Sequence, residues 1–567
     1  MSAQRSQFVL KFLPSFADFA FLMPAAFLFG RMAGAKTLLG DCDTGWHIRT
    51  GEWIAANHWV PARDIFSFSK PGDPWFAWEW LSDVVFAWIN SHGGLRAVVF
   101  FAILLLCATF GLLYRLVLRR ANALPAIAVM MLAVPASSIH WLARPHLFSL
   151  LFTVLFYGAL ESIRAGKDWL AGVPYLAIFP AATVLWTNLH GGFFIGILMI
   201  IAYSLAELLE FAFTRDEERR EGARRRGRAY AASALGCLAA SLLNPYTYHL
   251  HLHMLQYLRD PWNSQHIAEF LSPNFHHPTA LFFEALLVLG AASAARDLAR
   301  GRLHQPILIG MWAHAALLAT RNIPIFAIVT APAAAATLQE WLDGAAGWNV
   351  AGWARRAAAR FQQIAARTAE SEGVGRWHLV SAVALALIAA VIWSPHPPKK
   401  FRAEFDPAYY PAGALSALRR DASARIFTND EWGDYLIWSL YPSHRVFVDG
   451  RSDFYGDDFE SQYADVMNVQ TGWEKILSRF GVDTILLPPD APLAGALKES
   501  SRWHVVYDDH VALVFRPSDE AWGHPSSVAA IRGGAGRDRE ITKTEARDLS
   551  ITRGLESPAP SMIKTRS

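Results

Sequence analysis

The 567-residue sequence has little charge and very little cysteine. Asp, Glu, Lys and Arg supply only 18% of its residues, less than a soluble enzyme of this length needs to cover its surface. The net charge of +3 is too small to indicate a nucleic-acid partner. Cys107 and Cys237 stand in apolar runs and Cys42 has no partner nearby, so a disulfide framework is excluded.

Several catalytic signatures are also missing. The chain has no Walker loop, no Gly-rich dinucleotide fingerprint, no nucleophile elbow and no cysteine metal cluster. His249, His251 and His253 alternate along the chain, and residues two apart do not share a helix face, so we expect no metal site there. These absences argue against a nucleotide-binding enzyme.

Long apolar runs are what the sequence has in abundance. Hydrophobic residues make up 53% of the chain, and the mean hydropathy is +0.20. A helix needs about 20 apolar residues to cross a bilayer core of ~30 Å. Runs near that length occur at 12–33, 94–118, 123–141, 145–163, 170–187, 192–213, 229–244, 279–296, 306–320, 322–338 and 377–394. They predict about eleven transmembrane helices.

The basic residues predict the orientation of these helices. Segments rich in Lys and Arg alternate with segments poor in them, and the largest, 214–228, holds seven Arg. The positive-inside rule then places the N-terminus in the cytoplasm and the C-terminal region outside the plasma (inner) membrane. We interpret 214–228 as a solvated loop beside anionic lipid headgroups. No small-residue cleavage site clearly follows the first run, so we expect a retained helix and not a signal peptide.

The composition divides the chain into three parts. Residues 1–394 are predicted to form an all-α membrane bundle with a long outer loop at 34–93. Residues 395–517 read as a soluble periplasmic α/β domain. Its expected strands lie at 424–428, 445–449, 483–487, 504–508 and 511–515. Residues 518–567 have no apolar period and are expected to be a disordered tail.

The most concentrated polar motif runs from Gly40 to Trp53, just past the first predicted helix. It places Asp41, Asp43, His47 and Arg49 within nine residues at the membrane face. Carboxylates there can bind a divalent metal, act as a general base or steer a cationic group. The alternative is a capped interfacial helix, with Asp43 or Thr44 as its cap. The motif alone leaves both open.

Other polar clusters are predicted on the same side of the membrane. They are His140, Arg144 and His146; Asn188 and His190; Asn244, Tyr246, Tyr248, His249 and His251; and Arg321 and Asn322. Each residue taken singly fits an interface position that bonds a helix end. A one-sided accumulation indicates a cavity open to the outer face, because ionisable groups near membrane depth usually mark function. Arg144 and Arg321 suit a lipid-linked phosphate.

Two further segments admit two interpretations each. The aromatic run at 75–83 is typical of an interfacial helix, which we favour, or of a sugar-stacking surface. Residues 429–435 and 449–453 follow predicted strands and indicate either a ligand site or ordinary turns.

The layout and two motifs resemble the GT-C class of membrane glycosyltransferases. Asp43 to Thr50, DTGWHIRT, looks like the D-x-x-F-N-Y-R-T stretch of oligosaccharyltransferase catalytic subunits. Trp432-Gly433-Asp434-Tyr435 is similar to their W-W-D-Y-G signature, with Gly433 in place of the second Trp. The eleven-span layout with an outer C-terminus also resembles that of protein O-mannosyltransferases.

The resemblance implies transfer of a sugar from a polyprenyl-phosphate-linked donor to a glycan, lipid or protein acceptor at the outer membrane face. Asp43 or Asp41 would be the catalytic carboxylate, and Asp43 would be a ligand of a candidate divalent metal, Mg²⁺ or Mn²⁺. The candidate substrate-binding residues are His47, Arg49, Arg144, His146, Asn188, His190, Arg321, Asn322, Trp432 and Asp434. The alternatives are a transporter for lipid or polysaccharide, or a non-catalytic envelope-assembly protein.

Overall fold

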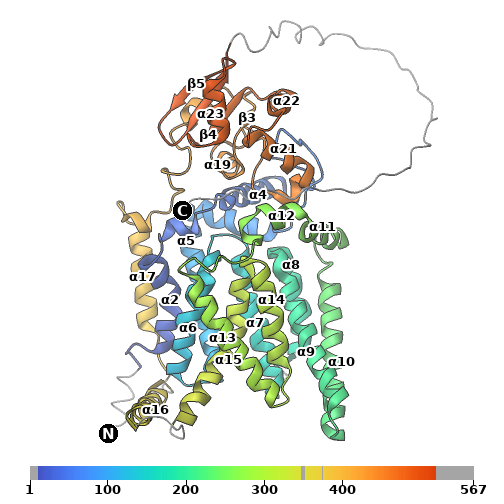
Figure 1. Cartoon of the computed structure of the whole chain (residues 1–567), viewed down its shortest axis with the longest axis vertical. Helices are drawn as coiled ribbons and strands as arrows, with labels where there is room; N and C mark the ends of the chain where they lie inside the picture. The colour runs from blue at the N-terminus through green and yellow to red at the C-terminus, as the bar shows by residue number, and fades with distance from the viewer. Residues whose placement is uncertain (1–10, 168, 171, 346–351, 373–374, 519–567) are drawn as a thin grey trace, which may run out of the picture. The chain divides into compact units, whose positions relative to one another are not determined.

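The computed structural model describes residues 11–167, 169–170, 172–345, 352–372 and 375–518 (Figure 1). All but the first residue of the predicted tail, 518–567, lies outside these described residues. The description below concerns the unit that ends at Ser518.

Helices form at every one of the predicted apolar runs. They are α2 (Phe16–Gly30), α5 (Trp80–Val117), α6 (Ala123–Ser137), α7 (His146–Arg164), α8 (Tyr175–Leu189), α9 (Phe194–Phe213), α10 (Glu217–Ala240), α13 (Ala280–Ala299), α14 (His304–Leu318), α15 (Ile323–Gly344) and α17 (Leu379–Ile392). Shorter or more polar segments between them form α3 (Ala35–Leu38), α4 (Asp43–Asn57), β1 (Trp169–Leu170), β2 (Val173–Pro174), α11 (Tyr248–Arg259), α12 (Pro261–His266) and α16 (Gly352–Glu372).

Five helical stretches in the described part of the chain are long and apolar enough to cross a membrane. They are Trp80–Val117, Ala123–His140, His146–Arg164, Phe193–Phe213 and Thr320–Gly344. The shorter apolar helices are α2, α8 and α17. The chain is therefore a multi-pass membrane protein, and the count of eleven spans stays a prediction.

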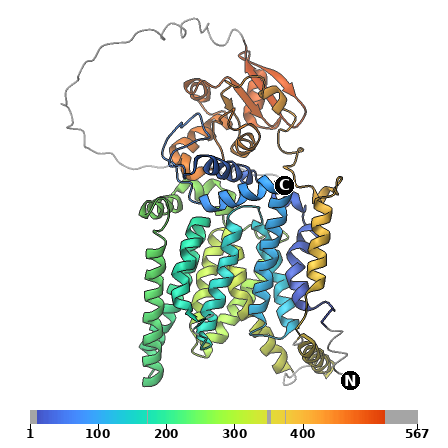
Figure 2. The same ribbon diagram turned by 180° about the vertical axis from the view of Figure 1, so that it is seen from behind.

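The long helices pack side by side, with α2 between α5 and α17, and α10 beside α9 (Figures 1 and 2). Helical backbones satisfy their own hydrogen bonds, so apolar side chains can fill the spaces between them. Phe110, Tyr114 and Phe326 are fully buried in this core. A few polar pairs cross it, such as Tyr157 Oη, which donates to Gln305 Oε1 at 2.9 Å.

The predicted outer loop at 34–93 is largely helical. It holds α3, α4 and the first turns of α5, which passes through a kink at Gly94 with φ of 64°. The aromatic run does not form the interfacial helix expected at 75–83, because α5 begins only at Trp80. The preceding residues are extended and bury Trp75.

Helix α4 lies between α5 and the C-terminal domain, and two glycines allow this close packing. A Cβ at Gly51 would lie 2.0 Å from the Asp83 carbonyl oxygen of α5. A Cβ at Gly45 would lie 2.7 Å from Cβ of Trp438 in α19 (Asp430–Leu440). Side chains larger than hydrogen would push these helices apart, so the glycines fix the position of α4 between both parts of the chain.

The C-terminal domain contains a four-stranded sheet in the order β3-β4-β6-β5. Its elements are α18 (Leu415–Leu418), β3 (Ile426–Phe427), α19 (Asp430–Leu440), α20 (Ser452–Tyr455), α21 (Asp457–Met467), α22 (Trp473–Arg479), β4 (Thr484–Leu487), α23 (Pro492–Glu499), β5 (Trp503–Asp508) and β6 (Leu513–Pro517). Strands β3 and β4 are parallel, whereas β6 is antiparallel to β4 and β5. All four residues of β4 are buried, as expected for a central strand.

The segment expected to be a strand at 445–449 differs from the prediction. Val446 makes only isolated bridges, to Ile426 and to Ser67 of the outer loop. The outer loop thus adds to the edge of the C-terminal domain, and Phe68 N donates to the Val446 carbonyl oxygen at 2.9 Å. A buried ion pair strengthens the junction, with Arg451 Nη2 2.8 Å from Asp64 Oδ1. Because this pairing joins residues far apart in sequence, local pattern does not reveal it.

Candidate functional site

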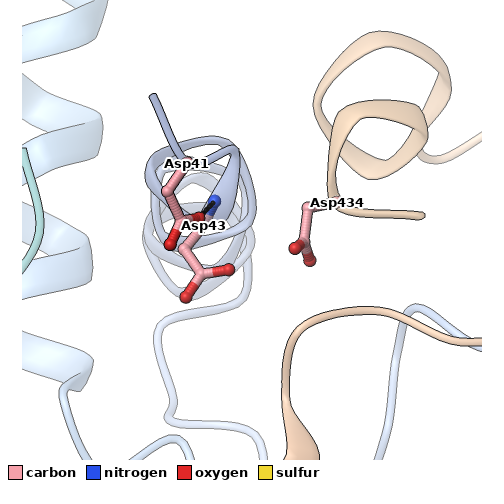
Figure 3. Close-up of side chains that lie close together, drawn as sticks. All are labelled: Asp41, Asp43 and Asp434. Carbon is pink, nitrogen blue, oxygen red and sulfur yellow. Dashed lines mark hydrogen bonds between the residues drawn. The ribbon is translucent and has the colours of Figure 1, made fainter. Parts of the chain in front are cut away.

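Three carboxylates meet where α4 begins. Oxygen atoms of Asp41, Asp43 and Asp434 all lie within 4.8 Å of one another (Figure 3). Asp41 Oδ1 accepts the backbone N–H of Asp43 at 2.7 Å, so Asp41 supports the helix start that the sequence assigned to Asp43 or Thr44. Asp434 comes from α19, and its Oδ1 accepts the backbone N–H of Gly450 at 3.0 Å. The acidic cluster therefore joins the outer loop to the C-terminal domain.

One arginine neutralises part of this cluster. Arg144 Nη1 lies 2.8 Å from Asp41 Oδ2, and Nη2 lies 2.6 Å from Asp43 Oδ2. Burial raises the pKa of Asp43, against the opposing charge of Arg144. Burial and the nearby charge of Asp43 raise the pKa of Asp434. Three carboxylates therefore share one guanidinium, and without a further cation the cluster is held partly neutral by protons.

The donor set fits a hard divalent cation. All three side chains offer carboxylate oxygens, which Mg²⁺, Mn²⁺ and Ca²⁺ prefer. Burial raises the pKa of the neighbouring Cys42 thiol well above its usual range, and its sulfur is not part of the cluster. Asp41, Asp43 and Asp434 are thus the residues that would hold a metal.

A cavity of about 330 Å³ opens beside the cluster. Asp43, Arg144, His190 and Arg321 all line it, although they come from four separate segments. Its other charged or polar lining residues include Glu79, His140, His146, Ser149, Glu269, Asn322, Arg451 and Asp453. The predicted clusters from 140 to 146, 188 to 190 and 321 to 322 therefore each contribute to one site.

Arg321 is the less committed of the two predicted phosphate ligands. Its Nη1 lies 3.5 Å from Glu269 Oε1, a long ion pair, and its guanidinium lies 3.7 Å from the centre of the Phe270 ring. Burial raises the pKa of Glu269, but the charges of His140, Arg144 and Arg321 outweigh it and lower that pKa to about 2. Glu269 is therefore an anion that holds Arg321 at the cavity wall.

Glu79 lies between two histidines. Its Oε2 is 3.5 Å from His47 Nε2, and its Oε1 is 3.3 Å from His190 Nε2. Burial raises the pKa of Glu79 to about 8. Behind it, His47 Nδ1 lies 2.7 Å from Asp83 Oδ1, which orients the imidazole. Glu79 is a cavity carboxylate that the sequence showed only as an acid inside an aromatic run.

The hydrogen bonds of His190 fix its tautomer. Its Nδ1 accepts the backbone N–H of Gly192 at 2.8 Å, so that nitrogen carries no proton. Ser149 Oγ lies 2.7 Å from the same Nδ1 and accepts the Trp186 indole N–H at 2.7 Å. Burial, with Arg321 and Arg144 adding to it, lowers the pKa of His190 to about 3. The neutral ring therefore presents Nε2–H to Glu79.

The remaining predicted residues occupy different places. His146 lines the cavity, and its Nε2 bonds the His140 carbonyl oxygen at 2.9 Å. Asn322 also lines the cavity, whereas Asp41 belongs to the acidic cluster and pairs with Arg144 without being among the cavity's described lining residues. His47, Arg49, Asn188 and Trp432 are not among the cavity's described lining residues.

Residues outside the cavity have structural partners. Arg49 Nε and Nη2 donate to the Trp438 carbonyl oxygen at 3.0 and 2.5 Å and so tie α4 to α19. Asn188 Oδ1 accepts the Trp80 indole N–H at 2.7 Å. Trp432 is buried, and its Nε1 donates to the Tyr409 carbonyl oxygen at 3.1 Å. In the structure these three side chains hold helices and loops together.

Sequence reasoning missed Glu269 and Ser149. Neither belongs to a recognisable motif, and each reaches the cavity only because the chain folds back on itself. The signal that could have indicated Glu269 is its charge within the His-rich segment 245–278, on the side where the other polar clusters gather.

Comparison with known proteins identifies the fold. No protein-family model and no curated protein sequence matches the chain. A crystal structure of the Archaeoglobus fulgidus oligosaccharyltransferase, tethered with an acceptor peptide containing the NVT sequon, superposes with a TM-score of 0.51. The match has 14% identity and covers 83% of this chain and 68% of that chain.

Two further solved structures match with lower TM-scores. The A. fulgidus oligosaccharyltransferase AglB in complex with an inhibitory peptide and a dolichol-phosphate gives a TM-score of 0.49, with 13% identity over 89% of this chain and 75% of that chain. ArnT from Cupriavidus metallidurans bound to undecaprenyl phosphate gives a TM-score of 0.42, with 14% identity over 89% of this chain and 98% of that chain. The first match shows the fold, so the predicted remote GT-C-like architecture is confirmed.

Proposed function

We propose that the chain is a membrane glycosyltransferase that transfers a sugar from a polyprenyl-phosphate-linked donor. One observation carries this proposal: a single cavity is lined by Asp43, Arg144 and Arg321, next to the acidic cluster. A donor of this class needs cationic groups for its phosphate and a carboxylate near the reacting carbon. The GT-C-like fold supports the same chemistry.

The two arginines would receive the donor phosphate. Arg321 stacks on Phe270 and has one long ion pair, with Glu269, so its guanidinium keeps donors for a phosphate. Arg144 is held by Asp41 and Asp43 and supplies a fixed positive potential. Both groups would stabilise the negative charge that develops on the phosphate as it leaves.

We assign the catalytic carboxylate of the acidic cluster to Asp43. The sequence left the choice between Asp41 and Asp43 open, and only Asp43 lines the cavity. A divalent metal held by Asp41, Asp43 and Asp434 would supply additional positive charge for the leaving phosphate. In this arrangement, Asp43 orients the acceptor in the cavity.

Glu79 is the group we assign to proton removal. An acceptor hydroxyl or amine would attack the anomeric carbon, the bond from that carbon to the phosphate oxygen would break, and the acceptor proton would pass to the Glu79 carboxylate. A carboxylate with a pKa near the working pH suits this role. His190 and His47 orient Glu79 from two sides.

The test is release of polyprenyl phosphate by the purified protein. A panel of polyprenyl-phosphate-linked hexoses and pentoses is incubated with an extract of envelope glycans and lipids, and the free lipid phosphate is measured by chromatography. We expect turnover with at least one donor and a loss of about 10²-fold or more in Asp43→Asn, the size seen when one transition-state stabiliser is removed. A transporter or a non-catalytic assembly protein would release none, and full activity of the variant would remove Asp43 from the mechanism.

A further inference from the structure

A second cavity lies at the other end of α7. It has a volume of about 390 Å³ and is lined by Leu116, Arg119, Arg120, Glu161, Ser162, Arg164, Ala165 and Lys167. The first cavity contacts the opposite end of the same helix, at His146 and Ser149. At 1.5 Å per residue, His146 and Arg164 are roughly 27 Å apart along the axis. That length is close to the ~30 Å of a bilayer core, so the two cavities lie at opposite membrane faces.

The charges in this second cavity are unbalanced. Four cationic side chains face one carboxylate, Glu161. Glu161 is already saturated: Arg120 and Arg164 pair with it, and Tyr203 Oη donates to it at 2.5 Å. Gln305 Nε2 adds a further bond at 3.3 Å. The buried carboxylate therefore has no capacity left for the other two cations.

Arg119 and Lys167 remain without a carboxylate partner among the described residues. Arg119 Nη1 donates only to neutral oxygens, the Ser162 hydroxyl at 3.0 Å and the Gly158 carbonyl at 3.4 Å. Lys167 is exposed at the rim. Guanidinium and ammonium groups gathered around one concavity are complementary to a phosphate, which can accept several charge-assisted hydrogen bonds.

Three arginines of α10, at this end of the bundle, behave differently. In α10, Arg224 pairs with Glu221 and Arg226 pairs with Glu207, each at 2.7 Å. Arg220 pairs with Glu217 at 3.7 Å on the same exposed helix. Those cations have their own carboxylates and line none of the cavities described here. The cations of the second cavity differ from these in converging on one concavity with a single carboxylate.

We propose that the cavity formed by Arg119, Arg120, Arg164 and Lys167 binds a phosphate ester, that of an anionic lipid headgroup, at the membrane face opposite the candidate active site. The ends of α5 and α7 place these side chains where the headgroup layer lies. The site is independent of the proposed function, because it shares no residue with the first cavity. Free phosphate has the same chemistry and is the competing source.

The experiment uses the full-length protein in detergent and native mass spectrometry. Phosphatidylglycerol, phosphatidylcholine and inorganic phosphate are added separately. We expect retention of phosphatidylglycerol over phosphatidylcholine, reduced about tenfold in the double variant Arg119→Gln/Lys167→Gln, since each basic residue near anionic lipid contributes severalfold. Both side chains lie at the surface or rim, so the fold should survive, and thermal unfolding checks this.

Arg220→Gln/Arg224→Gln is the matched control, because it removes two positive charges from the same end of the bundle without touching the cavity. It should leave retention unchanged. Equal loss in this control, or no preference for phosphatidylglycerol, would overturn the proposal. Binding of inorganic phosphate that depends on Arg119 and Lys167, with no lipid preference, would support the anion site and overturn its assignment to a headgroup.

Discussion

Arg144 Nη2 lies 2.6 Å from Asp43 Oδ2, and this pair joins the two chemical parts of the candidate site. On one side of it lies the acidic cluster with Asp434 of the C-terminal domain. On the other side lies the cavity that Arg321 helps to line. The proposed transfer needs both parts at once, and each can be tested by a change that spares the other.

Gly450→Ala should disrupt the acidic cluster without changing any charge. A Cβ at this position would lie 2.6 Å from Asp43 Oδ1 and 2.7 Å from Asp434 Oδ2, closer than atoms can approach. We expect turnover to fall at least tenfold. The midpoint of thermal unfolding should also drop, because overpacking typically lowers the free energy of unfolding by about 1–3 kcal/mol. Gly495→Ala is the control, because a Cβ there meets no atom within 4 Å. Equal behaviour of the two variants would contradict a close-packed cluster.

Arg321→Gln should weaken donor binding more than it slows chemistry. The variant loses a charge-assisted contact worth roughly 1.5–3 kcal/mol, so the dissociation constant for undecaprenyl phosphate should rise about tenfold or more. Fluorescence titration of the purified protein measures it. Arg300→Gln removes a cation that pairs with exposed Glu340 outside the cavity and should bind normally. Unchanged binding in Arg321→Gln would place the phosphate elsewhere.

Turnover should depend on the ionisation of Glu79. Burial raises its pKa to about 8, so a base at this position is mostly protonated at neutral pH. The rate should rise with the ionised fraction until the pH passes about 8, and Glu79→Gln should lose both that rise and most of the activity. An unaltered pH–rate profile in the variant would exclude Glu79 as the base.

The same group gives a prediction for stability. The pKa of Glu79 is higher in the folded protein, about 8, than its ordinary value of 4.5, so the folded state binds this proton more tightly. Its contribution to the free energy of unfolding is complete below pH 4.5 and is lost as pH rises through about 8. Thermal unfolding across this range should show a smaller decline in Glu79→Gln. A decline that is identical in both proteins would contradict the raised pKa.

Removal of divalent cations should abolish transfer. Asp41, Asp43 and Asp434 bring carboxylate oxygens within 4.8 Å of one another, and a bound cation would displace the protons that the raised pKa values of Asp43 and Asp434 retain. We expect EDTA to stop turnover, Mg²⁺ or Mn²⁺ to restore it, and Asp434→Asn to raise the metal concentration required. Activity that persists in EDTA with unchanged unfolding temperature would show that the cluster works without a metal.

The sequence predicted the membrane half well, because apolar length is a local property. A helix occurs at each expected run, and Asp43, Arg144, His190 and Arg321 share a cavity although their order in sequence says nothing about distance. Their common side of the membrane stays a prediction from the alternation of basic segments.

The parts that escaped prediction depend on long-range contacts. The β-bridge between Ser67 and Val446 joins the outer loop to the C-terminal domain. The hydrophobic periodicity of neither segment predicts this pairing. Arg49 looked like a substrate ligand by its spacing from Asp43, but the approach of α19 gives it the Trp438 carbonyl oxygen as a partner. Glu79 became a site candidate only once His47 and His190 were seen on either side of it.

The most direct test of the central claim is the position of a donor phosphate. A cryo-electron microscopy map of the protein with bound undecaprenyl phosphate would show it. The account predicts phosphate density in the cavity, within hydrogen-bond distance of the Arg321 or Arg144 guanidinium and on the same side as Asp43. Density for the phosphate outside this cavity, with the arginines still paired to Glu269, Asp41 and Asp43, would contradict it.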